Sequence, residues 1–164
     1  MRRRAGAAHR SLPATAEQLA FDFDADSRAL AEQQYERGCE MEARSPIRAC
    51  EAYRHALALW PDHPGARINL GRLLHEAGAA DDAEGHYRRA LAARPDDAVA
   101  AFNLGVALED LGRRQEAVEA YQRAIALDPA AADAHFNVSR LLEKLGDRVG
   151  AFRHLKAYRN LTRS

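Results

Sequence analysis

The sequence predicts an all-α fold built from about four stacked helix–turn–helix units. Three kinds of marker recur at a spacing of 34 residues in the 164-residue chain: a similar phrase, a small alanine followed four residues later by a larger side chain, and a proline. The phrases are "INLGRLLHEAG" from Ile68, "FNLGVALEDLG" from Phe102 and "FNVSRLLEKLG" from Phe136; the pairs are Ala49 with Tyr53, Ala83 with Tyr87, Ala117 with Tyr121 and Ala151 with Leu155; the prolines are Pro61, Pro95 and Pro129. A fixed period of this length is typical of solenoids, in which each unit covers the apolar face of its neighbour.

Apolar residues inside one unit follow helical spacing. Leu70, Leu73 and Leu74 lie on one stripe, and Gly78 follows where a left-handed C-terminal cap favours a residue without a β-carbon. Asp81, with Glu84 three residues later, predicts the N-terminus of a second helix. Because proline cannot continue that helix, it separates one unit from the next.

The first unit fits this pattern only with a turn that is one residue shorter. That register places Gly38 and Met41 on the buried stripe, with Ser45 as an N-cap and Pro46 in the first turn of the second helix. The array is then expected over residues 28–164, with repeats at about 31–63, 64–97, 98–131 and 132–164.

These markers resemble the tetratricopeptide repeat over about residues 31–164. The Leu-Gly pair of that family stands at Leu70-Gly71 and Leu104-Gly105 and becomes Val138-Ser139 in the last unit. The family's tryptophan is replaced; its position holds Arg67, Ala101 and His135. The resemblance implies a right-handed α-solenoid whose first helices line a concave groove, and it implies an adaptor that binds a protein or peptide partner.

The groove face of the first helices carries one asparagine per unit. Residues three or four apart share a helix face, so the expected peptide-binding residues are Asn69, Arg72, Phe102, Asn103, Phe136, Asn137 and Arg140. An asparagine amide both donates and accepts hydrogen bonds, which suits the backbone of an extended peptide. Two alternatives stay open: the asparagines bond only a neighbouring helix, and the phenylalanines belong to the core. A clamp for a C-terminal carboxylate is not expected, because Ile68 and Asp133 stand where basic residues would be needed.

The last helix, "DRVGAFRHLKAYRNLTRS", has two possible roles. Its basic residues could make it the polar cap of the array. Alternatively, Phe152, Leu155 and Tyr158 form an open surface for a partner or for a second copy in a homodimer. The second role would make the chain a regulatory or oligomerisation module.

The first 27 residues are expected to be a disordered arm, since "RRRAGAAHRSLPATAEQ" has low hydrophobicity and no period. The stretch "QLAFDFDAD" alternates apolar and acidic side chains, so we expect an extended segment that could occupy the groove. Tetratricopeptide arrays also occur joined to DNA-binding domains in bacterial regulators. The arginine-rich start resembles the end of a segment that would connect the array to such a domain.

Neither the composition nor the motifs of the sequence indicate an enzyme. The seven histidines form no metal-ligand spacing with Cys39 or Cys50, and no phosphate-binding glycine loop or nucleophile motif occurs, so we expect no catalytic residue, no metal, no cofactor and no small-molecule substrate. Residues 31–147 carry a net charge of −6, which disfavours nucleic acid along the main body. Without an apolar run long enough for a membrane or an export signal, the chain is expected to be cytoplasmic, with both cysteines reduced.

Overall fold

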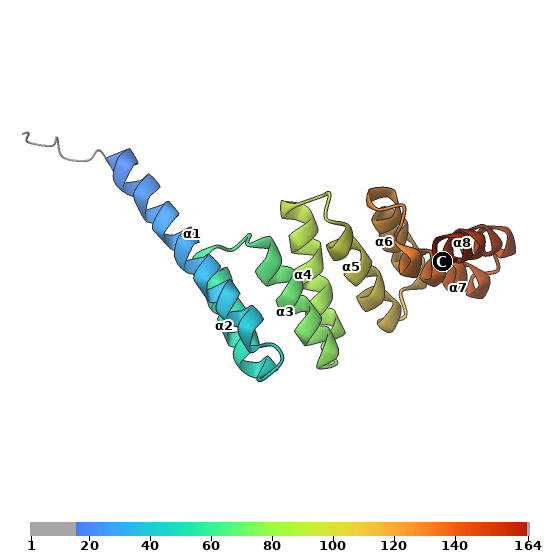
Figure 1. The fold of residues 1–164 in the computed structure, drawn as a ribbon, viewed down its shortest axis with the longest axis horizontal. Coiled ribbons are helices and arrows are strands. Elements are labelled where there is room, and N and C mark those ends of the chain that lie inside the picture. The colour runs from blue at the N-terminus through green and yellow to red at the C-terminus, as the bar shows by residue number, and fades with distance from the viewer. Residues whose placement is uncertain (1–15, 164) are drawn as a thin grey trace, which may run out of the picture.

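The structure is a computed structural model that describes residues 16–163, with side chains from Asp24 onward. Within this range the chain forms eight helices and no strand. The helices are α1 (Ala16–Met41), α2 (Pro46–Leu59), α3 (Pro64–Glu76), α4 (Ala80–Ala93), α5 (Ala98–Asp110), α6 (Arg114–Leu127), α7 (Ala132–Lys144) and α8 (Arg148–Leu161). Each helix packs on the next, and the four pairs follow one another in a row (Figure 1). The predicted all-α solenoid is confirmed.

Helix α1 begins at Ala16, ahead of the predicted start of the array at residue 28. The stretch "QLAFDFDAD", residues 18–26, is part of this helix, which differs from the extended, disordered arm expected there. The reason is local, because no glycine or proline interrupts the chain between Ala14 and Arg37 and most residues there are good helix formers. The N-terminal part of α1 extends away from the other helices (Figure 1). Residues 1–15 of the expected arm lie outside the described residues.

Glycines end the first helix of the last three pairs. Gly78, Gly112 and Gly146 have φ angles of 83°, 75° and 87°, as expected for left-handed caps. The predicted N-cap at Asp81 is wrong: α4 begins at Ala80, and Asp81 lies inside its first turn. There its negative charge still interacts favourably with the helix dipole.

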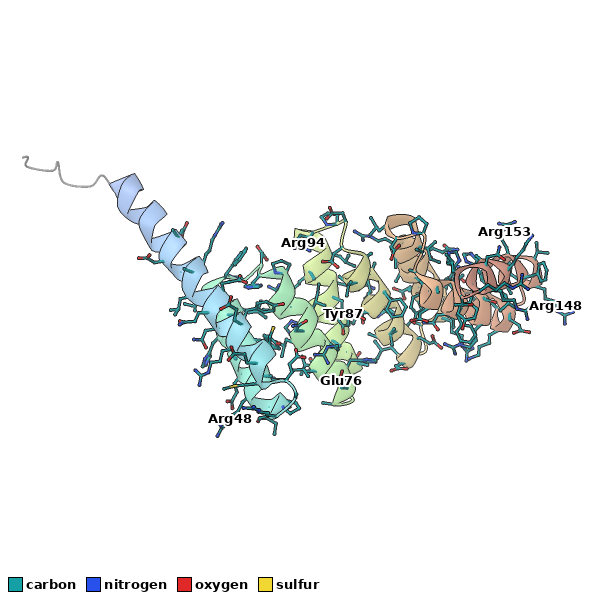
Figure 2. All side chains as sticks on the ribbon, viewed as in Figure 1. Arg48, Glu76, Tyr87, Arg94, Arg148 and Arg153 are labelled. Carbon is teal, nitrogen blue, oxygen red and sulfur yellow. The ribbon has the colours of Figure 1, made fainter. Side chains whose placement is uncertain are left out.

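The core of each of the first three pairs is a buried tyrosine that contacts a glycine of the preceding helix. Tyr87 lies in the interior of the array (Figure 2) and is 1% exposed. A β-carbon added to Gly71 would lie 2.8 Å from Cε1 of Tyr87, and one added to Gly105 would lie 2.6 Å from Cδ1 of Tyr121. The glycine is therefore required by the ring that packs against it.

The first pair confirms the shorter turn that the sequence suggested. Gly38 is buried, and a β-carbon there would lie 2.4 Å from Cε1 of Tyr53. The charged side chains Glu36, Arg37 and Glu40 are exposed. Ser45 occupies the N-cap position of α2 without a side-chain cap bond, and Pro46 is in the first turn.

Helix α1 is also attached to the turn before α3. The imidazole of His63 is buried, with Nε2 3.1 Å from a carboxylate oxygen of Glu32. Its Nδ1 accepts a hydrogen bond from the backbone N–H of Ala66, so His63 caps α3. The ring of Tyr35 lies 4.7 Å from the ring of His63. These contacts make the second half of α1 part of the first repeat.

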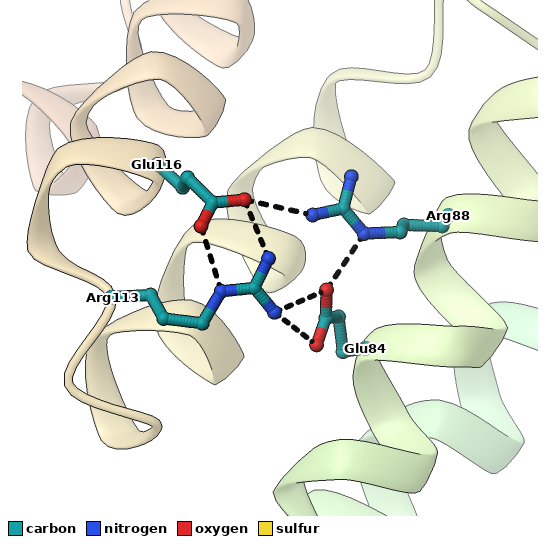
Figure 3. Close-up of polar contacts among 4 residues, drawn as sticks. All are labelled: Glu84, Arg88, Arg113 and Glu116. Carbon is teal, nitrogen blue, oxygen red and sulfur yellow. Dashed lines mark hydrogen bonds and ion pairs between the residues drawn. The ribbon is translucent and has the colours of Figure 1, made fainter.

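Helices α4 and α6 are joined by a ring of four charged side chains (Figure 3). Arg113 donates to Glu84 at 2.7 Å and to Glu116 at 2.5 Å, and Arg88 donates to the same two carboxylates at 2.7 Å and 3.2 Å. These four residues link the second and third helix pairs.

Candidate functional site

The hydroxyl of Tyr53 holds the side chain of Asn69. Asn69, at the middle of α3, donates through Nδ2 to the hydroxyl of Tyr53 at 3.1 Å and to Sγ of Cys39 at 3.7 Å. Burial raises the pKa of Tyr121, and the neighbouring side chain of Asn137 acts in the opposite direction. Among the described residues, Asn69 is the asparagine of this row that hydrogen-bonds the tyrosine of the preceding pair, as the alternative of a contact between neighbouring helices expects.

Asn103 differs from Asn69. It occupies the same position on α5 and is half-buried, but its side chain forms no hydrogen bond with a described residue. Asn69 and Asn137 are also half-buried, and Asn69 keeps an unused carbonyl oxygen.

A series of ion pairs and a histidine–aspartate hydrogen bond connects the turn after α1 with α3, α5 and α7. Arg72 pairs with Glu42 and, at 2.6 Å, with Glu76. Nε2 of His75 lies 2.7 Å from a carboxylate oxygen of Asp110. The guanidinium of Arg140 lies 2.5 Å from Oε1 of Glu109. We call these contacts the first-helix ion pairs.

These ion pairs change the role expected of the two arginines. Both side chains are little more than a third exposed, at 37% for Arg72 and 38% for Arg140, and each charge is already balanced by a glutamate. They are positioned by the protein rather than free to capture acidic groups of a ligand. Opposite charges spaced 30 or 31 residues apart are the signal of these pairs in the sequence, which the expected role of the two arginines did not include.

The two phenylalanines on this face have different environments. Phe102 is half-buried, packs against the core, and has its ring 5.4 Å from the ring of Tyr121. It also lines an apolar pocket of about 260 Å³ between α5 and the start of α7. Phe136 is 44% exposed, and its ring lies 5.2 Å from the ring of Tyr158. Phe102 is therefore mainly a core residue, whereas Phe136 presents an accessible apolar surface.

The C-terminal end of the array is apolar and partly open. Phe152 is 67% exposed and Val149 is 73% exposed, while Leu155 and Tyr158 are half-buried. Arg148 and Arg153 lie around this end (Figure 2). Of the three residues expected to form a partner surface, Phe152 is the most accessible.

Two family models match the sequence, both described as tetratricopeptide repeat. One matches residues 40–104 and the other residues 98–131, which together cover more than half of the chain. The chain belongs to the tetratricopeptide repeat family. No curated protein matches its sequence.

This tetratricopeptide repeat protein is similar in fold to several solved structures of MamA. A crystal structure of MamA has 23% identity and a TM-score of 0.76, and the match covers 88% of this chain and 85% of that one. MamA from Desulfovibrio magneticus RS-1, beginning at its residue 41, has 26% identity and a TM-score of 0.73, with coverage of 80% and 75%.

No group of three or more histidine, cysteine, aspartate or glutamate side chains is arranged to hold a metal ion among residues 24–163. None of the described helices is long and apolar enough to cross a membrane.

Proposed function

We propose that this chain is a protein-interaction scaffold whose first-helix face binds an extended segment of a partner protein. The family assignment supports a role in protein interaction. The observation that carries the groove proposal is the aligned row of half-buried asparagines, in which Asn103 has no hydrogen-bonding partner among the described side chains. An unpaired amide at the centre of such a row is suited to the backbone of a bound peptide.

The contacts on this face favour recognition of backbone over recognition of charge. Because Arg72 and Arg140 are already paired with glutamates, an acidic peptide gains little from them. Apolar side chains of the ligand can contact Phe136 and the pocket beside Phe102. Three asparagine hydrogen bonds contribute only about 0.5–1.5 kcal/mol each, so these apolar contacts must supply most of the affinity.

The test compares Asn103→Ala with Asn160→Ala, an exposed control on α8. Peptides are selected from a displayed random library on the wild-type chain, and their dissociation constants are measured by fluorescence anisotropy. We expect Asn103→Ala to weaken binding about three- to tenfold, the value of one hydrogen bond, and the control to leave it unchanged. Because Asn103 makes no side-chain hydrogen bond with a described residue, we expect the variant to keep the wild-type fold. Equal affinities of both variants for every selected peptide would contradict the groove proposal.

A second candidate function is self-association through the C-terminal end. The exposed side chains of Phe152 and Val149 on the last helix favour it. Light scattering over a range of concentrations should then show a dimer that Phe152→Glu abolishes. The exposed Ile47→Glu, on α2, provides the matched control. A monomer at all concentrations would reject the homodimer.

A further inference from the structure

A basic hollow lies between α2, α3 and α4, outside the groove and the C-terminal surface. The hollow has a volume of about 380 Å³. Its basic lining residues are Arg54 from α2, Arg67 from α3, and His86 and Arg89 from α4. The remaining lining is apolar: Leu57, Ala58, Pro61 and Leu70. No carboxylate lines this hollow. We call it the basic hollow.

Arg67 is the unusual member of this cluster. It stands at the position where the neighbouring units have Ala101 and His135, and it is only 7% exposed. Its Nε has no hydrogen-bond partner among the described residues. Its nearest acidic group is Asp62, 3.9 Å from Nη2 and itself 73% exposed. A guanidinium that is nine-tenths buried with so weak a partner is costly, since a buried charge requires compensation.

A second buried donor or acceptor lines the same hollow without a partner. Nδ1 of His86 is buried and forms no hydrogen bond to any described residue. Burial lowers the pKa of His86, and Arg67 and Arg89 lower it further, while Asp82 opposes them. Burial likewise lowers the pKa of Arg67, with a further contribution from Arg89. The basic groups therefore lie close enough to repel one another.

Within its own lining the basic hollow has an excess of positive charge, because three arginines and no carboxylate line it. Asp62 lines the adjoining hollow on one side, and Asp81 and Asp82 line the one on the other side of Arg89. Of these three aspartates, only Asp62 comes within ion-pair distance of an arginine of the basic hollow, and that arginine is Arg67. A doubly charged oxyanion would match this excess and would supply the acceptor that Nε of Arg67 lacks.

We propose that the basic hollow binds a phosphate-type oxyanion, with Arg67 as its buried anchor and Arg54 and Arg89 at its rim. Arg67 presents the planar guanidinium that binds oxyanions through two parallel hydrogen bonds. The two rim arginines are exposed, so the anion can enter from solvent, either as a free ion or as a phosphorylated side chain of a partner. This site is independent of the proposed peptide groove.

The test observes the Nε–H signal of Arg67 by NMR while inorganic phosphate replaces sodium chloride at constant ionic strength. We expect a saturable shift with a dissociation constant on the order of 1 mM or lower. The double variant Arg54→Gln/Arg89→Gln changes only exposed side chains, so it should fold and bind at least about tenfold more weakly. The control, Arg114→Gln/Arg148→Gln, removes two exposed arginines elsewhere and should bind as the wild type does.

Two results would overturn the proposal. One is a shift that grows linearly with phosphate and never saturates. The other is an equal affinity in the two double variants, which would reduce the effect to general screening. A parallel titration with O-phosphoserine distinguishes the two sources of the anion. Binding similar to that of inorganic phosphate supports a phosphorylated partner, and much weaker binding supports a free ion.

Discussion

Individual residues in this array are coupled across the boundary between repeats. Each tyrosine ring occupies the space left by a glycine of its own pair, and at Tyr53 the hydroxyl contacts Asn69 of the next pair. The last unit replaces the tyrosine by Leu155, and no further pair follows in the described chain that would offer an asparagine. There Ser139 stands in place of the glycine and donates instead to the backbone carbonyl of Ala151 at 2.8 Å.

The first prediction compares two glycine-to-alanine changes inside helices. Gly105→Ala would place a β-carbon 2.6 Å from Tyr121, so we expect overpacking to lower the unfolding free energy by about 1–3 kcal/mol. Gly85→Ala has no atom within 4 Å of the new carbon, and better helix propensity should raise stability by about 0.5–1 kcal/mol. Urea unfolding measures both. Equal effects of the two changes would contradict the tyrosine–glycine packing.

The second prediction concerns two histidines in the last repeat. Nδ1 of His135 lies 3.0 Å from Nδ1 of His154, an arrangement in which one ring must donate and the other accept. Burial lowers the pKa of His154, and His135 and Arg153 lower it further. A histidine whose pKa is lower in the folded state binds protons preferentially in the unfolded state. Above about pH 6.5, the pKa of histidine in the unfolded chain, the pair contributes its full stability. This contribution is lost as the pH falls through the lower pKa of His154 in the folded protein.

Urea unfolding at several pH values tests this dependence. We expect the unfolding free energy to decrease on acidification below about pH 6.5, and His154→Gln to flatten part of that slope. His55→Gln, an exposed change on α2, should preserve the wild-type slope. If His154→Gln unfolds with the wild-type pH dependence, the histidine pair makes no contribution.

At the scale of the helices, side-chain charges join elements that the backbone does not join directly. Glu84 of α4 has a side chain only 13% exposed and accepts hydrogen bonds from Arg88 and Arg113. Partial burial alone would raise the pKa of Glu84, but the hydrogen bonds from the two arginines lower it overall. The charge of Glu84 therefore stabilises the contact between α4 and α6.

The third prediction is that Glu84→Gln lowers the unfolding free energy by about 1 kcal/mol, because its two arginine partners are partly exposed and such pairs contribute little each. Glu119→Gln, an exposed change on α6, should have little effect. Urea unfolding at low and high salt measures the difference between the variants, which should shrink at high salt because the charges are screened. A difference that is independent of salt would assign the loss to packing instead.

At the scale of the whole molecule, the array has two unlike ends. The C-terminal end exposes Phe152, whereas the N-terminal end continues as a helix that projects beyond its partner (Figure 1). Among its described side chains, α1 packs on the array from Arg28 onward, with Arg28 over the ring of Trp60 and with Glu32 and Tyr35 against the first repeat. The length of α1 therefore exceeds what the first repeat requires.

The fourth prediction compares a chain that begins at Arg28 with one that begins at Glu36. The shorter chain lacks Glu32 and Tyr35, which uncovers His63, and we expect it to be less stable by about 3 kcal/mol or more. Urea unfolding can be followed by the fluorescence of Trp60, the single tryptophan, whose ring lies 4.8 Å from that of His63. Equal stability of the two chains would mean that α1 contributes nothing to the first repeat before Glu36.

The sequence by itself determined the repeat, the helix pairs and the glycine caps, because these depend on local spacing and on backbone conformations that only certain residues adopt. It also predicted that Asn69, Asn103 and Asn137 share a face, and this follows directly from the 34-residue period. Only the tertiary structure decided what those side chains contact. The hydroxyl of Tyr53, the glutamates beside Arg72 and Arg140, and the cluster around Arg67 come from other helices. Such contacts depend on how neighbouring pairs stack, and a period in the sequence does not specify which polar groups that stacking brings within hydrogen-bonding distance.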